Sequence, residues 1–290
     1  MLRAFLIEDR LPHRGQMNPE LIAGKFRLAF DRPLVMGIVN VTPDSFSDGG
    51  QHATSGAAIA HAWRLIEEGA DILDIGGESS RPGARPVSAD EELARVMPVI
   101  AALRDANLPL SIDTAKPEVM RAALDAGAAM VNDIEALQHA EALAVVARSD
   151  AAVCLMHMQG NPRTMQAAPS YRDVVGEVGD FLRARALAAL AAGIPRERIV
   201  LDPGFGFGKT AEHNLILMRR FGELTALGFP LLAGLSRKAM LGALTGKPTG
   251  ERVHASVAAA LILAQRGAAM LRVHDVAATR DALAVLAASR

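Results

Sequence analysis

Short apolar runs alternate with longer runs rich in alanine and leucine along most of this chain of 290 residues. The short runs are apolar at nearly every position, which is typical of parallel strands that are buried on both faces. The longer runs have the length expected of helices. The predicted strands are 34–39, 71–75, 108–113, 129–133, 151–157, 198–202, 229–236 and 269–274, and the clearest helices are 55–68, 89–105, 117–126, 172–192, 251–266 and 276–288.

Eight strand–helix units in a chain of this length predict the α/β class and a single-domain (β/α)8 (TIM) barrel. An open, doubly wound sheet is the alternative, because alternation alone does not show that the first and last strands meet. The barrel is expected to span 34–290. Residues 1–33 are expected to form a short β-rich lead-in that packs on the barrel.

One short pattern occurs three times, in EGADILD (68–74), AGAAMVN (126–132) and RGAAMLR (266–272). Each copy has a glycine just after a predicted helix, where a left-handed backbone conformation is common. Five residues after each glycine, a polar residue ends the predicted strand. Ordinary helix–strand connections explain the glycines but not the polar residues. These polar residues are Asp74, Asn132 and Arg272.

Polar residues follow the apolar positions at the carboxyl end of every predicted strand. In a (β/α)8 barrel these ends lie on one side, where active sites are built. A single aspartate at a strand end is more often a helix cap than a catalytic group, but eight polar ends together predict the floor of a polar pocket. They are Asn40, Asp74, Asp113, Asn132 with Asp133, His157, Asp202, Ser236 with Arg237 and Lys238, and Arg272 with His274 and Asp275.

The stretch LDPGFGFGKT (201–210) raises the question of a nucleotide-binding loop. A P-loop that ends in Lys209 and Thr210 needs a glycine where this chain has Pro203, and the glycines are spaced G-x-G-x-G instead of the dinucleotide-binding G-x-G-x-x-G. We therefore interpret the stretch as a strand that ends in Asp202, followed by a tight turn at the pocket mouth with Phe205 or Phe207 as an aromatic wall.

Composition narrows the classes of function. Hydrophobic residues make up 50% and the net charge is -1, which is typical of a well-buried globular protein without nucleic-acid or membrane partners. The first residues do not resemble a signal peptide, and no apolar run approaches the ~20 residues of a membrane span. The single cysteine, Cys154, lies in an apolar run and is predicted to be a core residue. One cysteine fits a reducing compartment, so we expect a cytoplasmic protein.

Eight motifs follow one another along 34–290, and together they resemble those of the dihydropteroate synthase family of pterin-binding barrels. The resemblance implies a transferase that joins 6-hydroxymethyl-7,8-dihydropterin pyrophosphate to 4-aminobenzoate, giving 7,8-dihydropteroate and pyrophosphate in folate biosynthesis. It also implies Mg²⁺ as cofactor, sulfonamides as inhibitors and a homodimer. The motifs are MGIVNVTPDSFSDGG (36–50), DIGGESSRPGA (74–84), SIDTAKPEV (111–119), VNDI (131–134), MHMQGNPRTMQ (156–166), DPGFGFGK (202–209), GLSRK (234–238) and RVHDV (272–276).

The resemblance implies a role for individual residues. The pterin ligands would be Asp113, Asn132, Met156, Asp202 and Lys238, of which Asp113, Asp202 and Lys238 would be catalytic. Pyrophosphate would contact Asn40, Arg272 and His274, with Asn40 also binding Mg²⁺. The 4-aminobenzoate pocket would contain Ser80, Arg81, Pro82, Phe207, Ser236 and Lys238, under a lid with Asp44, Ser45 and Phe46.

These residue types suit the implied chemistry. A pterin presents adjacent donors and acceptors, which carboxylates and carboxamides can pair. Arginine binds phosphate through planar, bidentate donors, and the oxygen of a carboxamide is a hard ligand that suits Mg²⁺. Departure of pyrophosphate leaves a cationic methylene group on the pterin. The carboxylates of Asp113 and Asp202 would stabilise that cation before the amine attacks.

One departure from the family pattern and two alternative functions bear on this interpretation. The chain has Ser80 where many members have threonine. The hydroxyl is kept, so we expect activity to survive, while the effect on sulfonamide affinity stays open.

A methyltetrahydrofolate methyltransferase-type barrel is one alternative function, but it has no need of a pyrophosphate site such as Asn40, Arg272 and His274. The other alternative is a catalytically silent pterin-binding paralogue.

Overall fold

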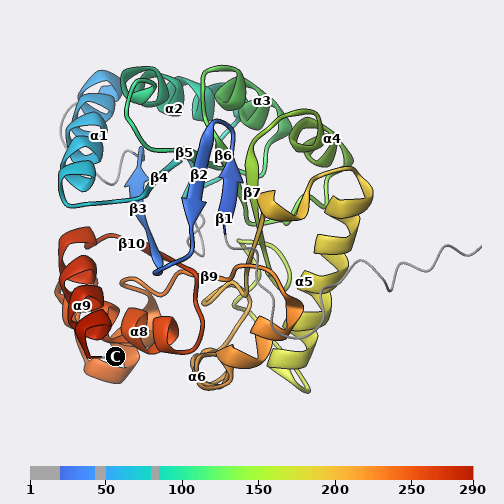
Figure 1. The fold of residues 1–290 in the computed structure, drawn as a ribbon, viewed down its shortest axis with the longest axis vertical. Coiled ribbons are helices and arrows are strands. Elements are labelled where there is room, and N and C mark those ends of the chain that lie inside the picture. The colour runs from blue at the N-terminus through green and yellow to red at the C-terminus, as the bar shows by residue number, and fades with distance from the viewer. Residues whose placement is uncertain (1–19, 43–49, 80–84, 290) are drawn as a thin grey trace, which may run out of the picture.

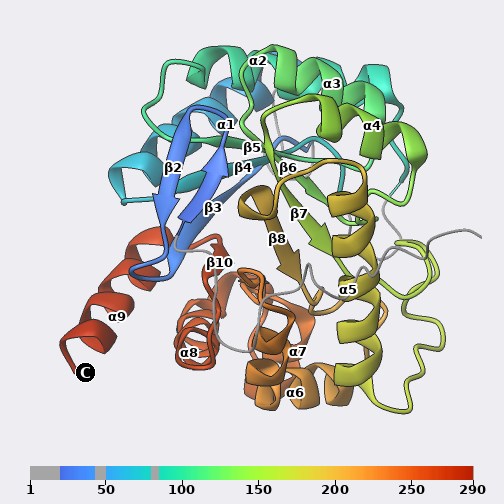
Figure 2. The same ribbon diagram turned by 45° about the vertical axis from the view of Figure 1, so that its right-hand side comes forward.

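The computed structural model describes residues 20–42, 50–79 and 85–289. Parallel strands form the centre of this part of the chain, and helices surround them (Figures 1 and 2). The strands are β3 (Leu34–Asn40), β4 (Ile72–Gly76), β5 (Leu110–Asp113), β6 (Met130–Asp133), β7 (Ala152–Met156), β8 (Ile199–Asp202), β9 (Leu232–Ala233) and β10 (Met270–Val273). The helices are α1 (Gly50–Glu67), α2 (Ala89–Leu103), α3 (Pro117–Asp125), α4 (Ala140–Arg148), α5 (Val174–Ala191), α6 (Ala211–Arg219), α7 (Ala239–Thr245), α8 (Val253–Gln265) and α9 (Val276–Ala288).

The eight strands join edge to edge into a barrel. Their order is β8-β7-β6-β5-β4-β3-β10-β9, and every ladder between them is parallel. The two edge strands of this order also meet, because Leu201 forms a bridge with Leu231 and its N–H donates to the Pro230 carbonyl at 2.9 Å. The predicted (β/α)8 barrel is therefore confirmed, and the doubly wound alternative is wrong.

β9 is much shorter than predicted. The sequence predicts a strand over 229–236, but only two residues form it. Pro230 has no N–H to donate to a ladder, and the backbone of Arg237 turns to a positive φ of 58° just beyond the strand. These two residues limit regular pairing at both ends of the segment.

Helix ends follow the sequence signals. Ser88 is the N-cap of α2 and accepts a hydrogen bond from the Glu91 N–H, which is typical of a serine three residues before a glutamate at a helix start. The repeated glycines Gly69, Gly127 and Gly267 all have positive φ, of 91°, 111° and 95°. They therefore end their helices in the way that the repeated pattern indicates.

An antiparallel hairpin of β1 (Glu20–Ala23) and β2 (Phe26–Ala29) lies across one end of the barrel (Figure 1). Leu21 and Ala23 pack with Leu34 and Met270, which begin their strands, so the covered end is the amino-terminal one. This hairpin confirms the β-rich lead-in where it is described. Cys154 lies in the same apolar cluster and is fully buried, as predicted. None of the described helices has the length and hydrophobicity needed to span a membrane.

Candidate active site

The interior side chains of a (β/α)8 barrel form layers, each built from four alternate strands. The strands are tilted, with a shear of about 8, so that a step of two strands shifts the level by about two residues. Asp74 of β4 is in register with Met130 through the intervening strand, so Asn132 of β6 lies level with Asp74. The same step leads from Asn132 to Asp202 of β8, and from Arg272 of β10 to Asp74. We call these four residues the polar layer.

The polar layer is held together by hydrogen bonds. The Arg272 Nε donates to the Asp74 Oδ2 at 2.6 Å, and the Asn132 Nδ2 donates to the same oxygen at 3.0 Å. Three members of this layer are the polar residues of the repeated glycine pattern. The pattern thus places one polar residue from each of three strands at the same depth in the barrel. The layer beneath, from the same four strands, is fully buried and apolar, with Ile72, Met130, Val200 and Met270.

Asp113 of β5 lies just above the polar layer and pairs with it. The Arg272 Nη2 donates to the Asp113 Oδ2 at 2.6 Å, so one guanidinium group connects two carboxylates. Burial raises the pKa of Asp113 to about 7; Arg272 opposes this rise, and the negative charge of Asp74 adds to it. Asp113 can therefore change its charge near neutral pH.

Asp202 and Lys238 carry opposite charges, and each charge shifts the pKa of the other group. The Asp202 Oδ1 accepts from the Gly204 N–H at 2.7 Å, and burial raises the pKa of its carboxyl group. The Lys238 Nζ donates to the Phe205 carbonyl and lies 4.4 Å from the centre of the Phe207 ring. Burial lowers the pKa of Lys238 to about 8, although Asp202 favours the charged form.

The glycine-rich stretch is a tight turn at the edge of this site. Gly204 and Gly208 have positive φ, and a Cβ at Gly204 would lie only 1.9 Å from the His157 carbonyl oxygen. Phe205 is buried and stacks on Phe221, with ring centres 6.2 Å apart. Phe207 is therefore the aromatic residue of the stretch that reaches the site.

Lys209 fills the inside of this turn and does not reach out to a ligand. It is 2% exposed, and its Nζ contacts the His157 Nδ1 at 2.9 Å and the carbonyls of Gly204 at 2.9 Å and Phe207 at 3.0 Å. Burial and the neighbouring Lys209 lower the pKa of His157 to about 3, so His157 is neutral. His157, a polar strand end in the sequence, is thus a structural partner of Lys209.

Comparison of the sequence with known proteins identifies the family to which this chain belongs. The family model of pterin binding enzymes matches residues 36–274. Dihydropteroate synthase of Neisseria meningitidis serogroup B is 54% identical over 270 residues, which cover 91% of this chain and 95% of that protein. The chain belongs to the dihydropteroate synthase family.

Solved structures of this family have the same fold. The structure of Xanthomonas albilineans dihydropteroate synthase with 4-aminobenzoic acid superposes with a TM-score of 0.89 at 57% identity, covering 94% of this chain and 98% of that one. The Yersinia pestis dihydropteroate synthase structure with a sulfonamide drug complex has a TM-score of 0.89 at 47% identity, covering 93% of this chain and 99% of that one. The resemblance inferred from the eight motifs is therefore confirmed.

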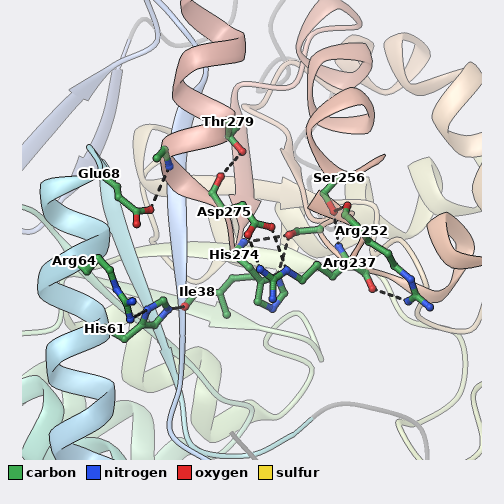
Figure 3. A network of polar contacts seen from close by, with 12 residues as sticks. Ile38, His61, Arg64, Glu68, Arg237, Arg252, Ser256, His274, Asp275 and Thr279 are labelled. Atoms are coloured by element: carbon green, nitrogen blue, oxygen red, sulfur yellow. Dashed lines mark hydrogen bonds and ion pairs between the residues drawn. The ribbon is translucent and has the colours of Figure 1, made fainter. Parts of the chain in front are cut away.

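The dihydropteroate synthase motifs that contain Arg237 and His274 meet in a second polar cluster (Figure 3). The Ser236 Oγ is 2.9 Å from the His274 Nδ1 and accepts from the His274 N–H at 3.1 Å. Beside them, the Arg237 guanidinium pairs with Asp275, and its backbone N–H donates to the Ser256 Oγ at 2.9 Å. The pair of Arg237 and Asp275 thus joins the segments that follow β9 and β10. Ser236 and His274, assigned to two different pockets in the sequence analysis, lie in direct contact.

Other predicted residues lie apart or were not placed. Asn40 ends β3, half-buried, opposite Gly76. Asp133 points away from the barrel interior and accepts the N–H groups of Glu135 at 2.8 Å and Leu137 at 2.7 Å, so it caps a turn and is not part of the pocket floor. Outside the described residues lie Ser80, Arg81 and Pro82 of the second-strand loop, and Asp44, Ser45 and Phe46 of the predicted lid.

One cluster near the site was not predicted. The Lys116 Nζ donates to Glu78 and, at 2.5 Å, to the fully buried Glu92. The Glu78 Oε1 also accepts from the Val87 N–H at 3.3 Å. This cluster joins the two described ends of the segment that contains the predicted 4-aminobenzoate residues. Glu78 and Lys116 both lie inside family motifs, which was the available signal.

Proposed function

We propose that this protein condenses 6-hydroxymethyl-7,8-dihydropterin pyrophosphate with 4-aminobenzoate, giving 7,8-dihydropteroate and pyrophosphate. The observation that carries the proposal is the polar layer at the carboxyl ends of the strands, with Asp113 and Lys238 beside it. A floor with three carboxylates, an amide and two cations suits a heterocycle rich in donors and acceptors together with an anionic leaving group. This function also accounts for Phe207, which provides an aromatic face beside Lys238.

The pterin ring would lie on the polar layer. Asp113, Asn132 and Asp202 supply acceptors for the N–H groups of the ring, and Lys238 supplies a donor. Met156 of β7 is in register with Asp202 and offers an apolar surface to the ring face. We propose these five residues as the pterin ligands.

The leaving group would lie toward Asn40, Arg272 and His274. Among the described residues no group of three His, Cys, Asp or Glu side chains could hold a metal ion. A Mg²⁺ site here would therefore have few protein ligands. The carboxamide oxygen of Asn40 fits such a site, because Mg²⁺ commonly binds one or two protein oxygens, water and the substrate's phosphates. When bound, the ion would neutralise charge on the pyrophosphate.

The reaction follows from the charges around the methylene carbon of the pterin. Loss of pyrophosphate leaves positive charge on the pterin, and the carboxylates of Asp113 and Asp202 stabilise it. The neutral amine of 4-aminobenzoate then attacks the methylene carbon and loses a proton. Lys238, with its lowered pKa, stays within reach of both rings and balances the charge of Asp202. Cys154 has no part in this scheme, since it is fully buried and its pKa is raised by burial.

We also propose the assembly, inhibitor and location that the family resemblance implies. Sulfonamides would compete at the pocket of Phe207, Ser236 and Lys238. A homodimer would cover apolar side chains late in the chain, where Leu261 and Ile262 of α8 are only partly buried and Val285 of α9 is 71% exposed. Light scattering of the purified protein would test the dimer. A single, buried cysteine is consistent with the cytoplasm.

A condensation assay tests the proposed function. The protein is mixed with both substrates and Mg²⁺, and dihydropteroate is followed by chromatography. We expect product that disappears without Mg²⁺ and decreases with sulfonamide. The matched control is Asp113→Asn, which keeps size and hydrogen bonding but removes the carboxylate; we expect turnover to fall more than pterin affinity. Pterin binding without product would favour the silent paralogue, and product from the control at the normal rate would reject the role of Asp113.

A further inference from the structure

Asp74 is the member of the polar layer that has no role in the mechanism above. Its side chain is fully buried, with 0% exposure, so it does not contact a ligand in the pocket. Both of its side-chain hydrogen bonds among the described residues go to site residues, Asn132 and Arg272. Asp74 therefore acts on a ligand only through these two neighbours.

The bond to Asn132 fixes the direction of an amide group. A carboxamide has a donor end and an acceptor end, whereas an ionised carboxylate can only accept. Asn132 must therefore turn its Nδ2 toward Asp74, at 3.0 Å, which leaves its Oδ1 as the atom available to a ligand. With an apolar neighbour in place of Asp74, no acceptor would fix which end of the amide faces the ligand.

The bond to Arg272 fixes a guanidinium plane. Asp74 holds the Nε at 2.6 Å while Asp113 holds the Nη2 at 2.6 Å, so the group is held from two sides. The Asp113 Oδ2 therefore accepts from Arg272. The position of the Asp113 carboxylate relative to the pocket thus depends on the bond between Asp74 and Arg272 as well.

We propose that Asp74 is a positioning residue that sets the hydrogen-bond polarity of the pterin site, by turning Asn132 and by holding Arg272. The site then presents a row of acceptors from Asn132, Asp113 and Asp202, which selects heterocycles with adjacent N–H donors, such as a 2-amino-4-oxopyrimidine ring. This inference rests on the proposed function, since it concerns the ligand of the same site.

The surroundings of Asp74 allow charge and hydrogen bonding to be separated. The Asp74 Oδ1 and the Ser111 Oγ are both buried without a hydrogen-bond partner among the described residues, and the two residues are opposite each other in the β4–β5 ladder. In Asp74→Asn, the amide oxygen can take the position of Oδ2 and still accept from Asn132 and Arg272, while the amide nitrogen takes the position of Oδ1. Asp74→Leu has nearly the same volume and no acceptor.

The experiment compares two ligands by titration calorimetry, 6-hydroxymethylpterin and the analogue in which hydrogen replaces the 2-amino group. The wild-type protein is expected to prefer the amino compound by about tenfold or more, the worth of one hydrogen bond to a charged or oriented acceptor. Asp74→Asn should keep that preference within about threefold, because Asn132 stays oriented. Asp74→Leu should lose most of the preference. A purely structural role would weaken both ligands equally and leave the ratio unchanged.

The outcomes distinguish this inference from the proposed function. An unchanged ratio in Asp74→Leu, or an equal loss of the ratio in both variants, overturns the role of Asp74 while the pterin site stands. Failure of the wild-type protein to bind either compound overturns both. If Asp74→Leu does not fold, Asp74→Ser replaces it, because its shorter hydroxyl side chain does not reach Asn132 and the same loss of preference is expected.

Discussion

Lys209 is buried inside the glycine-rich turn and Lys238 is half-buried beside it, and the surroundings of these two lysines differ in kind. Lys209 is 2% exposed, and three protein acceptors surround its Nζ, from His157, Gly204 and Phe207. Lys238 has one hydrogen-bond acceptor among the described residues, the Phe205 carbonyl, and lies over the Phe207 ring.

The difference teaches how to interpret a buried lysine. Burial lowers the pKa of both, to about 7 for Lys209 and about 8 for Lys238, so a shifted pKa alone does not mark the functional group. The number of donors already used by the protein does. Lys209 has none left for a ligand and holds the turn, whereas Lys238 has donors to offer beside Asp202 and Arg272.

Among the variants considered, Lys238→Met should have the largest effect, which is a loss of turnover with little loss of stability. The variant keeps the apolar stem and removes the cation beside the reacting groups, so we expect turnover to fall by about 10²–10³-fold. Its melting temperature should change by only a few degrees, because few protein hydrogen bonds are lost. Steady-state kinetics and a thermal melt measure the two quantities. A protein that melts much lower, or retains full turnover, would remove the distinction between the two lysines.

Lys209→Met should mainly reduce stability. The variant leaves buried carbonyls and the ring of His157 without a donor, at about 1–3 kcal/mol for each group, so a total near 3 kcal/mol is expected. For a protein of this size that lowers the melting temperature by about 10 °C. The exposed Lys25→Met is the control and should melt like the wild type. An unchanged melting temperature in Lys209→Met would show that the turn does not depend on this lysine.

The difference in stability between the wild type and Lys209→Met should depend on pH. The pKa of Lys209 is about 7 in the folded protein, against an ordinary value of 10.5. Between these values the unfolded chain binds a proton that the folded protein lacks, so the free energy of unfolding rises with pH. The gap between wild type and Lys209→Met should therefore widen from pH 7 to pH 9, by about 1 kcal/mol per unit. Denaturant titrations at several pH values measure it; a gap that narrows would reject a neutral Lys209.

Tyr171→Phe should have the smallest effect. The Tyr171 hydroxyl donates to the Gly208 carbonyl at 2.8 Å and so supports the same turn from outside. Its loss removes one neutral hydrogen bond, worth about 1 kcal/mol, or a few degrees in melting temperature. Turnover should stay within about twofold of wild type, since 1.4 kcal/mol is needed for a tenfold change. A loss of stability as large as that of Lys209→Met would mean that the turn is held chiefly from outside.

The sequence predicts the barrel and the depth of its polar floor, because both depend on short-range patterns. Apolar runs define the strands, and the glycine repeat places Asp74, Asn132 and Arg272 at equal distances from their helix ends. The contacts between side chains of different strands, in contrast, depend on residues that are far apart in the sequence. The contact between Arg272 and two carboxylates therefore appears only in three dimensions.

Two errors have local physical causes. Asp133 looked like a site residue, yet neighbouring side chains of a strand point to opposite faces, so with Asn132 inside the barrel Asp133 must face outward. The strand predicted at 229–236 is shorter in the structure because Pro230 cannot donate to a ladder. Lys209, Glu78 and Lys116 each have at least one partner tens of residues away, so their roles could not be predicted from spacing.

The shared level of Asp74, Asn132, Asp202 and Arg272 has a consequence for how this chain can change over evolutionary time. Substituting any one of them alters a single group, but deleting one residue within a strand shifts every later side chain of that strand to the opposite face. In β4 such a shift would bring Leu73 or Ile75 into the pocket and press a carboxylate into the apolar shell beneath the helices. The strands should therefore keep their lengths while the loops vary. New ligand preferences would then arise by substitution of residues within the strands, and not by insertion or deletion.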